Sequence, residues 1–120
     1  MIRVLKPVEV RDGDKIARLD PATAASFSFD IDFASAAIGR QRRAVALTPD
    51  AFARDISAAR TFGFLHEVEA LRRMGLARGG SLENAVVVDG DRIVNEGGLR
   101  FKDEFVRHKI LDAVGDLSLA

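Results

Sequence analysis

The sequence predicts an α+β fold: a two-layer sandwich in which a mixed or antiparallel sheet of about five strands carries helices on one face. Two Asp-Gly pairs, at positions 12–13 and 89–90, lie between apolar segments and are typical of tight hairpin turns. Residues 26–33 alternate between apolar and polar side chains, as a half-buried strand does. Apolar residues recur at helical spacing in three further segments, 48–60, 65–74 and 103–116.

The composition favours one soluble domain spanning residues 1–120. Hydrophobic residues make up 48% and charged residues 30%, which excludes a disordered chain. The 18 basic and 18 acidic residues balance, so there is no electrostatic footprint for nucleic acid. The absence of cysteine fits a reducing compartment, and neither a signal peptide nor an apolar run of about 18 residues is present. We therefore expect a cytoplasmic protein without a membrane span.

The first segment is expected to be a hairpin. Apolar residues from Ile2 to Val10 mark an extended strand, and Pro7 favours an edge or a bulge there. The turn at 11–14 leads to a return strand over 15–19, which Asp20-Pro21 ends. The next strand, 26–33, directs four apolar side chains to one face: Phe27, Phe29, Ile31 and Phe33. Residues 39–43 are predicted to be a basic loop and 44–47 a short strand.

Two helices follow. Thr48 is a good N-cap because Pro49 follows it at the first helical position, and the helix should stop near Ala59 or Arg60. Its expected buried face consists of Phe52, Ile56 and Ala59. The second helix, 65–74, should end at Gly75. Its expected buried residues are Leu65, Val68 and Leu71.

The remaining chain is read as a joint, a hairpin and a final helix. Gly79-Gly80-Ser81 is a flexible joint without the spacing or the lysine of a phosphate-binding loop, and residues 85–94 form the second hairpin. The final helix, 103–116, has an apolar stripe formed by Val106, Ile110, Ala113 and Val114. The stripe beside it carries Phe105, His108, Lys109, Asp112 and Asp116.

His108 and Asp112 are one helical turn apart, so both side chains can reach one metal ion. Two ligands are too few for a zinc site, which needs three or four, and the only other histidine is His66. From spacing alone, a solvated surface pair worth a few tenths of a kcal/mol is the more common arrangement.

Three stretches carry a resemblance to a known family: Arg60-Thr-Phe-Gly-Phe64, the run from Phe101 to Arg107, and His108-Lys-x-x-Asp-x-x-Gly-Asp116. With them the chain resembles the zinc-dependent UDP-3-O-acyl-N-acetylglucosamine deacetylases of lipid A biosynthesis over nearly all of its 120 residues. The resemblance implies the second domain of such an enzyme. The first domain, with a zinc histidine and the general-base glutamate, and a downstream segment with a catalytic histidine would be absent.

The resemblance also implies roles for individual residues. His108 and Asp112 match zinc ligands, and Asp116 matches the acid that orients the catalytic histidine. Thr61 matches the residue whose hydroxyl stabilises the oxyanion, with Gly63 allowing a sharp turn that exposes it. The positions that match substrate-binding residues are Lys15, Asp32, Phe33, Phe62, Glu67 and Lys109.

Residues 65–94 match an inserted helix-and-strand subdomain that forms a hydrophobic passage for the fatty acyl chain. The expected lining residues are Leu65, Val68, Leu76, Leu82, Ala85 and Val87. An ordinary apolar core is the alternative for each of them.

The expected function is that of part of a zinc-dependent hydrolase. The complete enzyme would remove the N-acetyl group from UDP-3-O-acyl-N-acetylglucosamine, with that substrate and the first domain as its partners. The isolated chain is expected to be inactive. The alternative is a non-catalytic α+β module that binds a nucleotide sugar or serves as a scaffold.

Overall fold

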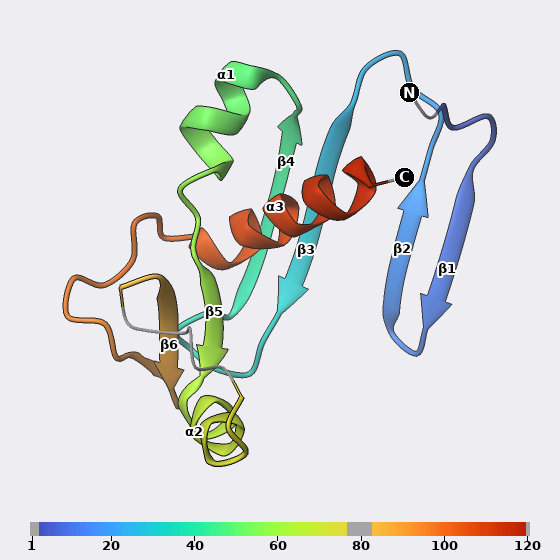
Figure 1. The fold of residues 1–120 in the computed structure, drawn as a ribbon. Helices are drawn as coiled ribbons and strands as arrows, with labels where there is room; N and C mark the ends of the chain where they lie inside the picture. The colour runs from blue at the N-terminus through green and yellow to red at the C-terminus, as the bar shows by residue number, and fades with distance from the viewer. Residues whose placement is uncertain (1–2, 77–82, 120) are drawn as a thin grey trace.

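The computed structural model of the protein describes residues 3–76 and 83–119. Seven strands and three helical segments follow one another along these residues (Figure 1). In chain order they are β1 (Val8–Asp12), β2 (Lys15–Leu19), β3 (Ser26–Asp32), β4 (Arg40–Ala46), α1 (Pro49–Ala51) continued by the π-helical turn η1 (Phe52–Ile56), β5 (Thr61–Phe64), α2 (Leu65–Arg73), β6 (Ala85–Asp89), β7 (Arg92–Ile93) and α3 (Glu104–Ser118).

The strands form three small sheets, which confirms the α+β class. β1 pairs with β2 and β3 with β4, both antiparallel. The third sheet has the order β5-β6-β7, with β5 parallel to β6 and β7 antiparallel to it. The predicted mixed and antiparallel pairing is therefore present, although the strands are distributed over three sheets and not joined into one of about five.

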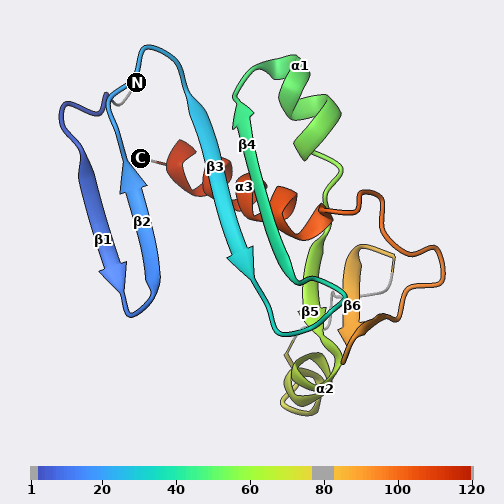
Figure 2. The same cartoon turned by 180° about the vertical axis from the view of Figure 1, so that it is seen from behind.

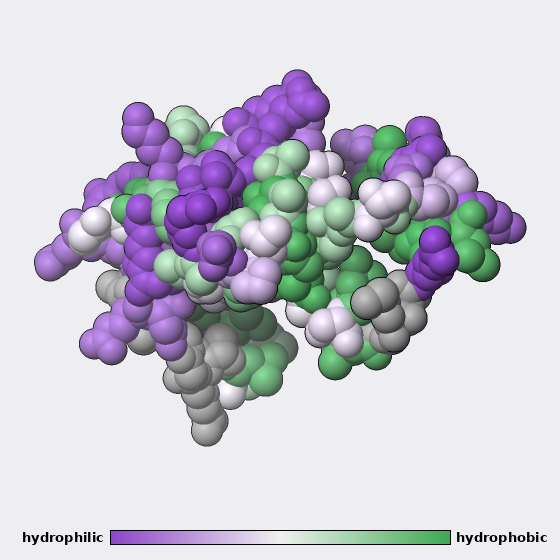
Figure 3. Space-filling view, turned by 90° about the horizontal axis from the view of Figure 1, so that it is seen from above, coloured by the Kyte–Doolittle hydropathy of each residue, from purple (hydrophilic) through white to green (hydrophobic). Residues whose placement is uncertain are grey.

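The β1–β2 hairpin lies beside β3, on the side away from β4 (Figures 1 and 2). Its predicted turn is confirmed, with Gly13 at φ 63°. Every residue of both strands is exposed, including Val10 at 64% and Ile16 at 56%. Seen from above, hydrophobic surface is visible at this end of the molecule (Figure 3). The hairpin is held by its own pairing and contributes little to the core.

The predicted basic loop at 39–43 is wrong, because residues 40–43 begin β4. Asp30 on β3 explains the difference: its carboxylate accepts a hydrogen bond from Arg40 at 2.9 Å and lies 3.3 Å from Arg42. Arg40 and Arg42 therefore lie on the outer face of a strand. The residues between and after them face inward in alternation, up to Val45, which is buried. The alternation predicted for β3 is confirmed.

The first helix begins as predicted, with the Thr48 hydroxyl accepting a hydrogen bond from the Ala51 amide at 3.1 Å. It becomes a π-helical turn and ends at Ile56, earlier than predicted. Ile56 and Ala59 are both buried, as expected. The sharp turn predicted around Gly63 is wrong, because residues 61–64 form β5 beside β6.

Gly63 matters for packing and not for a turn. A Cβ atom at this position would lie 3.2 Å from Cγ2 of Val68, so the glycine lets α2 approach β5.

Helix α2 ends before Gly75, which has the left-handed φ of 77° expected of a C-terminal glycine. Leu71, predicted to be buried on α2, is instead 40% exposed. Gly79 to Ser81, the predicted joint, lie outside the described residues, as do Ile2 and Leu82.

α3 supplies the centre of the core and crosses the β3–β4 ribbon (Figures 1 and 2). Half of its predicted stripe is buried: Val106 is fully buried, and Ile110 clusters with Val45 and Ile56. The other two residues, Ala113 and Val114, are half-buried. Phe105, on the neighbouring stripe, is buried as well. It belongs to a second cluster that contains Ile38, Val86 and Val88. The two clusters fix α3 between the sheets and so fix the direction of its polar face.

Candidate active site

His108 and Asp112 meet on the polar face of α3. His108 Nε2 and Asp112 Oδ1 are 3.2 Å apart, and the His108 side chain is only 14% exposed while that of Asp112 is 54% exposed. The other ring nitrogen, Nδ1, lies 3.0 Å from the carbonyl oxygen of Ala59. Because a carbonyl can only accept, this contact places a hydrogen on Nδ1. In the neutral ring, Nε2 then presents a lone pair toward the Asp112 carboxylate.

Two acceptor atoms that face each other at 3.2 Å need a proton or a cation between them. Donors of one tetrahedral Zn²⁺, at bond lengths of about 2.0–2.2 Å, lie roughly 3.4 Å apart. The pair therefore fits two positions of a zinc site. Within the described residues no further histidine, cysteine or carboxylate joins the pair, so a metal ion bound here would need additional ligands from outside this chain.

Glu104 is the most deeply buried charged group beside this pair. Its side chain is fully buried, and Arg60 Nε donates to Oε2 at 2.8 Å while Arg60 Nη2 donates to Oε1 at 3.0 Å. The backbone amides of Arg60 and Arg100 each donate to the carboxylate at 2.8 Å. Burial raises the pKa of Glu104, but these hydrogen bonds outweigh it and leave the pKa below its usual value. Glu104 is therefore a buried carboxylate anion.

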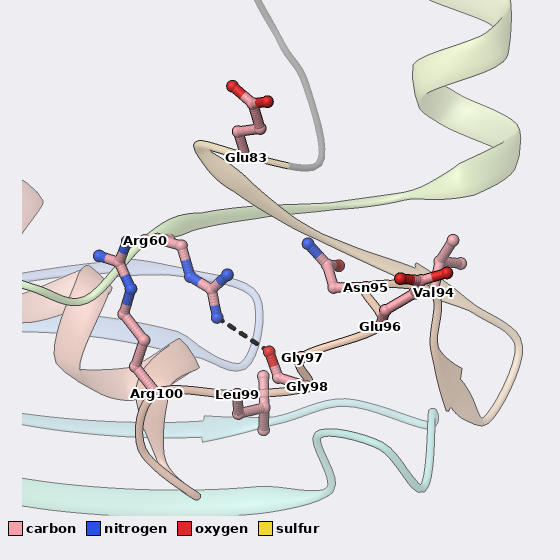
Figure 4. Close-up of a pocket in the computed structure, with 9 residues that line it drawn as sticks. All are labelled: Arg60, Glu83, Val94, Asn95, Glu96, Gly97, Gly98, Leu99 and Arg100. Carbon is pink, nitrogen blue, oxygen red and sulfur yellow. Dashed lines mark hydrogen bonds between the residues drawn. The ribbon is translucent and has the colours of Figure 1, made fainter.

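Arg60 extends this network to the chain before α3. Its Nη2 also donates to the carbonyl oxygen of Gly98 at 3.0 Å (Figure 4). The hydrogen bond to Glu104 raises the pKa of the Arg60 guanidinium, so the pair stays ionised. Arg60 thus connects three segments: the start of β5, the loop at Gly98 and the first turn of α3.

Aromatic rings pack together near Lys109, the residue that follows His108 on α3. The Phe62 ring packs edge-on against Phe105 at 5.0 Å and against Phe33 at 5.8 Å between ring centroids. Lys109 Nζ lies 5.5 Å from the centroid of Phe62, on the same stretch of α3 as His108. Phe33 is half-buried in this cluster, as its strand phase predicts. The structure therefore brings together three predicted substrate-binding residues, Lys109, Phe62 and Phe33, and Lys109 directly follows His108 on α3.

Thr61 is exposed at the first position of β5, two residues after Ala59. Asp116 is exposed one turn beyond Asp112 on α3. Glu67 lies on α2, which begins where β5 ends, so the length of β5 separates it from Thr61. Lys15 is at the turn end of the exposed β1–β2 hairpin. The structure therefore does not bring Lys15 or Glu67 to the His108 pair within this chain.

The residues predicted to line the acyl passage differ in how deeply they are buried. Val87 is buried, Leu76 is 51% exposed, and three are half-buried. The half-buried ones are Leu65, Val68 and Ala85. One cavity, of about 510 Å³, lies between Arg60, Arg100 and the loop from 94 to 99, and none of the predicted passage residues lines it (Figure 4).

A family model described as LpxC, UDP-3-O-acyl N-acetylglycosamine deacetylase, matches residues 1–120. The chain belongs to this deacetylase family. A relative from Phenylobacterium zucineum, named UDP-3-O-acyl-N-acetylglucosamine deacetylase, is 63% identical over 116 residues, which are 97% of this chain and 40% of the relative. A relative of the same name from a Nitratiruptor species is 56% identical over 119 residues, or 99% of this chain and 40% of the relative. The chain thus spans about 40% of the length of these two deacetylases.

Two residues of this deacetylase segment were missed by sequence reasoning: Glu104 and Arg60. An acid in the first turn of a helix is ordinary, because it interacts favourably with the helix dipole, and it is usually exposed. Only the tertiary arrangement, which brings residues 60 and 100 to α3, shows that Glu104 is buried.

Among the described residues, no helix is long and apolar enough to cross a membrane.

Proposed function

We propose that this chain is part of a zinc-dependent deacetylase that removes the N-acetyl group from UDP-3-O-acyl-N-acetylglucosamine in lipid A biosynthesis. The family membership supports the reaction and the substrate class. The observation that carries the proposal is the meeting of His108 Nε2 and Asp112 Oδ1 at 3.2 Å, with Nδ1 fixed by Ala59. A solvated surface pair has no need of a histidine whose second nitrogen is held by a backbone carbonyl.

In this proposal His108 and Asp112 hold Zn²⁺ together with ligands from outside the chain. When bound, the ion supplies Lewis acidity that polarises the acetamide carbonyl and activates water. The Ala59 carbonyl keeps the Nδ1 hydrogen in place, so the Nε2 lone pair remains available as a ligand. Such a partner on the outer nitrogen is the usual companion of a metal-binding histidine.

Thr61 and Lys109 act on the substrate. The exposed Thr61 hydroxyl donates to the oxyanion that forms when water adds to the amide carbonyl. Lys109, held over the Phe62 ring, places a positive charge where it offsets the diphosphate of the nucleotide. Phe62 provides apolar surface at the sugar, and the Phe33 ring offers a face on which uracil stacks. Asp116 orients a histidine from outside the chain, which protonates the departing amine.

A chimaera provides the direct test. This chain replaces the matching segment of the Phenylobacterium relative, and acetate release from UDP-3-O-acyl-N-acetylglucosamine is measured before and after zinc removal by a chelator. We expect activity in the chimaera, none in the 120-residue chain alone, and loss on chelation that Zn²⁺ restores. His108→Ala and Asp112→Asn should each lower kcat/KM by at least about 100-fold.

His66→Ala is the matched control, because His66 also lies near a carboxylate, 3.9 Å from Glu67, but at an exposed site. It should keep the activity of the parent chimaera. Full activity in the His108→Ala chimaera, or activity that is indifferent to chelation, would show that the proposal is wrong. Turnover by the isolated chain would contradict the expected need for the remaining segments.

A further inference from the structure

The proposed chemistry gives Glu104 no task, although its carboxylate is fully buried. It accepts four hydrogen bonds within 3.0 Å, three from Arg60 and one from the amide of Arg100. Neither oxygen is left to receive a substrate or a proton. A buried carboxylate whose acceptor positions are all used in this way serves to hold the segments that donate to it in place.

Glu104 and His108 are one turn apart on α3, and both face the segment that leads into β5. Glu104 Oε2 accepts from the amide of Arg60 at 2.8 Å, and His108 Nδ1 lies 3.0 Å from the carbonyl oxygen of Ala59. That amide and that carbonyl belong to one peptide group, the bond between Ala59 and Arg60. Because a peptide group is planar and rigid, its two ends cannot turn independently.

We propose that Glu104 is a positioning residue for the proposed deacetylation, which sets His108 and Thr61 through the Ala59–Arg60 peptide. The carboxylate holds the amide end of the peptide, and the fixed plane points the carbonyl end at His108 Nδ1. The same hydrogen bond also fixes the position of the next residue in the chain, Thr61. Glu104 thereby selects the ring tautomer that leaves Nε2 free for a ligand and sets the distance between the imidazole and the Thr61 hydroxyl. This inference rests on the proposed function for the roles of His108 and Thr61.

Removing the charge at Glu104 should release the peptide. In Glu104→Gln one carboxylate oxygen becomes an amide nitrogen, which cannot accept a hydrogen bond. Where that nitrogen takes the Oε2 position, the Arg60 amide loses its acceptor, and in the other orientation the remaining oxygen is neutral and accepts more weakly. The Ala59–Arg60 plane can then rotate, and its carbonyl moves off His108 Nδ1. Without that acceptor the ring hydrogen divides between Nδ1 and Nε2. A residue that supports only the stability of the fold would leave the tautomer of a folded variant unchanged.

The experiment uses the 120-residue chain without metal or substrate. Ring and amide nitrogens are followed by ¹⁵N NMR in the parent chain, in Glu104→Gln and in Asp103→Asn. Asp103 is the matched control, because it precedes Glu104 and is also tied to two arginines, Arg43 at 3.0 Å and Arg107 at 2.6 Å. Among the described residues, its carboxylate bonds are to Arg43 and Arg107, whereas the Arg60 amide donates to Glu104.

The spectra are recorded at a pH at which the imidazole is neutral, because protonation would also bring its two nitrogen shifts together. There the parent chain should show His108 with its hydrogen on Nδ1. In Glu104→Gln the two His108 ring nitrogen shifts should move toward each other, and the Arg60 amide should exchange with solvent about tenfold faster or more. Asp103→Asn should change neither signal. Unchanged His108 shifts in a folded Glu104→Gln chain would overturn the proposal. An equal change in Asp103→Asn would also overturn it, because the effect would then be a general loosening of α3.

If Glu104→Gln does not fold, Glu104→Asp is the second variant. It keeps the negative charge, but its side chain is one methylene shorter, so the carboxylate draws back from the Arg60 amide. A shift of the His108 nitrogens in the same direction supports the proposal, and unchanged nitrogens in a folded Glu104→Asp chain overturn it. All of these signals are read without zinc. A failure of the inference is therefore distinct from a failure of the proposed function, which the chimaera measures by acetate release.

Discussion

Glu104 and His108 bind opposite ends of the same peptide group. Glu104 Oε2 accepts a hydrogen bond from the Arg60 amide at 2.8 Å, and His108 Nδ1 donates one to the Ala59 carbonyl oxygen at 3.0 Å. The two side chains lie one turn apart on α3, so the helix holds the strand that begins at Thr61 at two adjacent points. The candidate metal ligand and the candidate oxyanion residue are thus connected by backbone and not only by proximity.

The first prediction concerns acid stability. The pKa of Glu104 is lowered in the folded chain, so its stabilisation is complete above the usual glutamate pKa of about 4.3 and is lost as the pH falls through the lower folded value. Asp103 acts in the same direction, because Arg107 and Arg43 outweigh its burial and lower its pKa. The free energy of unfolding, measured with urea, should therefore fall between about pH 5 and pH 2, within about a unit at either end.

Glu104→Gln should remove about 3–5 kcal/mol of stability at pH 7, because it leaves Arg60 without its charged partner. The difference from the parent chain should shrink at pH 3, where the parent begins to lose the same ion pair. A difference that is equal at both pH values would contradict the buried carboxylate as its source.

The second prediction tests the close approach of α2 to β5. Gly63→Ala places a methyl group 3.2 Å from Cγ2 of Val68, so the Val68 side chain must give by a few tenths of an ångström against β5, which we expect to cost about 1 kcal/mol. Gly97→Ala is the control, since its Cβ meets nothing within 4 Å, and it should change stability by less than about 0.5 kcal/mol. Thermal unfolding of both variants measures the contrast, and equal costs would argue against the packing role of Gly63.

The third prediction compares two valines in strands. Val86 is fully buried on β6, and Val86→Ala should cost about 2 kcal/mol because it leaves a cavity beside Phe105. Val10 on the hairpin is 64% exposed, and Val10→Ala should stay within about 0.5 kcal/mol. Urea denaturation distinguishes them. A large loss at Val10 would mean that the hairpin packs on the core in solution.

The fourth prediction concerns Thr61 in the chimaera. Thr61→Val keeps the shape of the side chain but removes the hydroxyl, so kcat for acetate release should fall about 100-fold with little change in KM. Because Thr61 is exposed, the variant should unfold at nearly the same temperature as the parent. A kcat within about twofold of the parent would remove Thr61 from the reaction.

Much of the fold could be predicted from local chemistry. Asp-Gly turns, the alternation of β3, the Thr48 cap and the apolar stripe of α3 all depend on residues close in sequence, and each is present in the structure. The start of β4 was missed because four basic or polar residues resemble a loop, until the fold places Asp30 of β3 beside Arg40 and Arg42. β5 was missed because its partner, β6, is more than 20 residues away in the chain.

The candidate site was predictable only in part. The spacing of His108 and Asp112 places them together on one helix face, and family resemblance identified Thr61. The network around Glu104 could not be read from the sequence, because its donors come from residues 60 and 100, which the fold brings together. Lys15 and Glu67 remain apart from the pair in this chain, and their proposed contacts with substrate are still predictions.

The most direct measurement is a Zn²⁺ titration of the 120-residue chain followed by the ¹⁵N signals of both histidines. We predict that His108 Nε2 shifts or broadens while Nδ1 keeps its hydrogen, and that Asp112→Asn weakens this response. His66, which has a carboxylate nearby but no backbone partner for its ring among the described contacts, should respond only at higher Zn²⁺. Binding through Nδ1, or an equal response from His66, would contradict the metal-ligand role of the His108 and Asp112 pair.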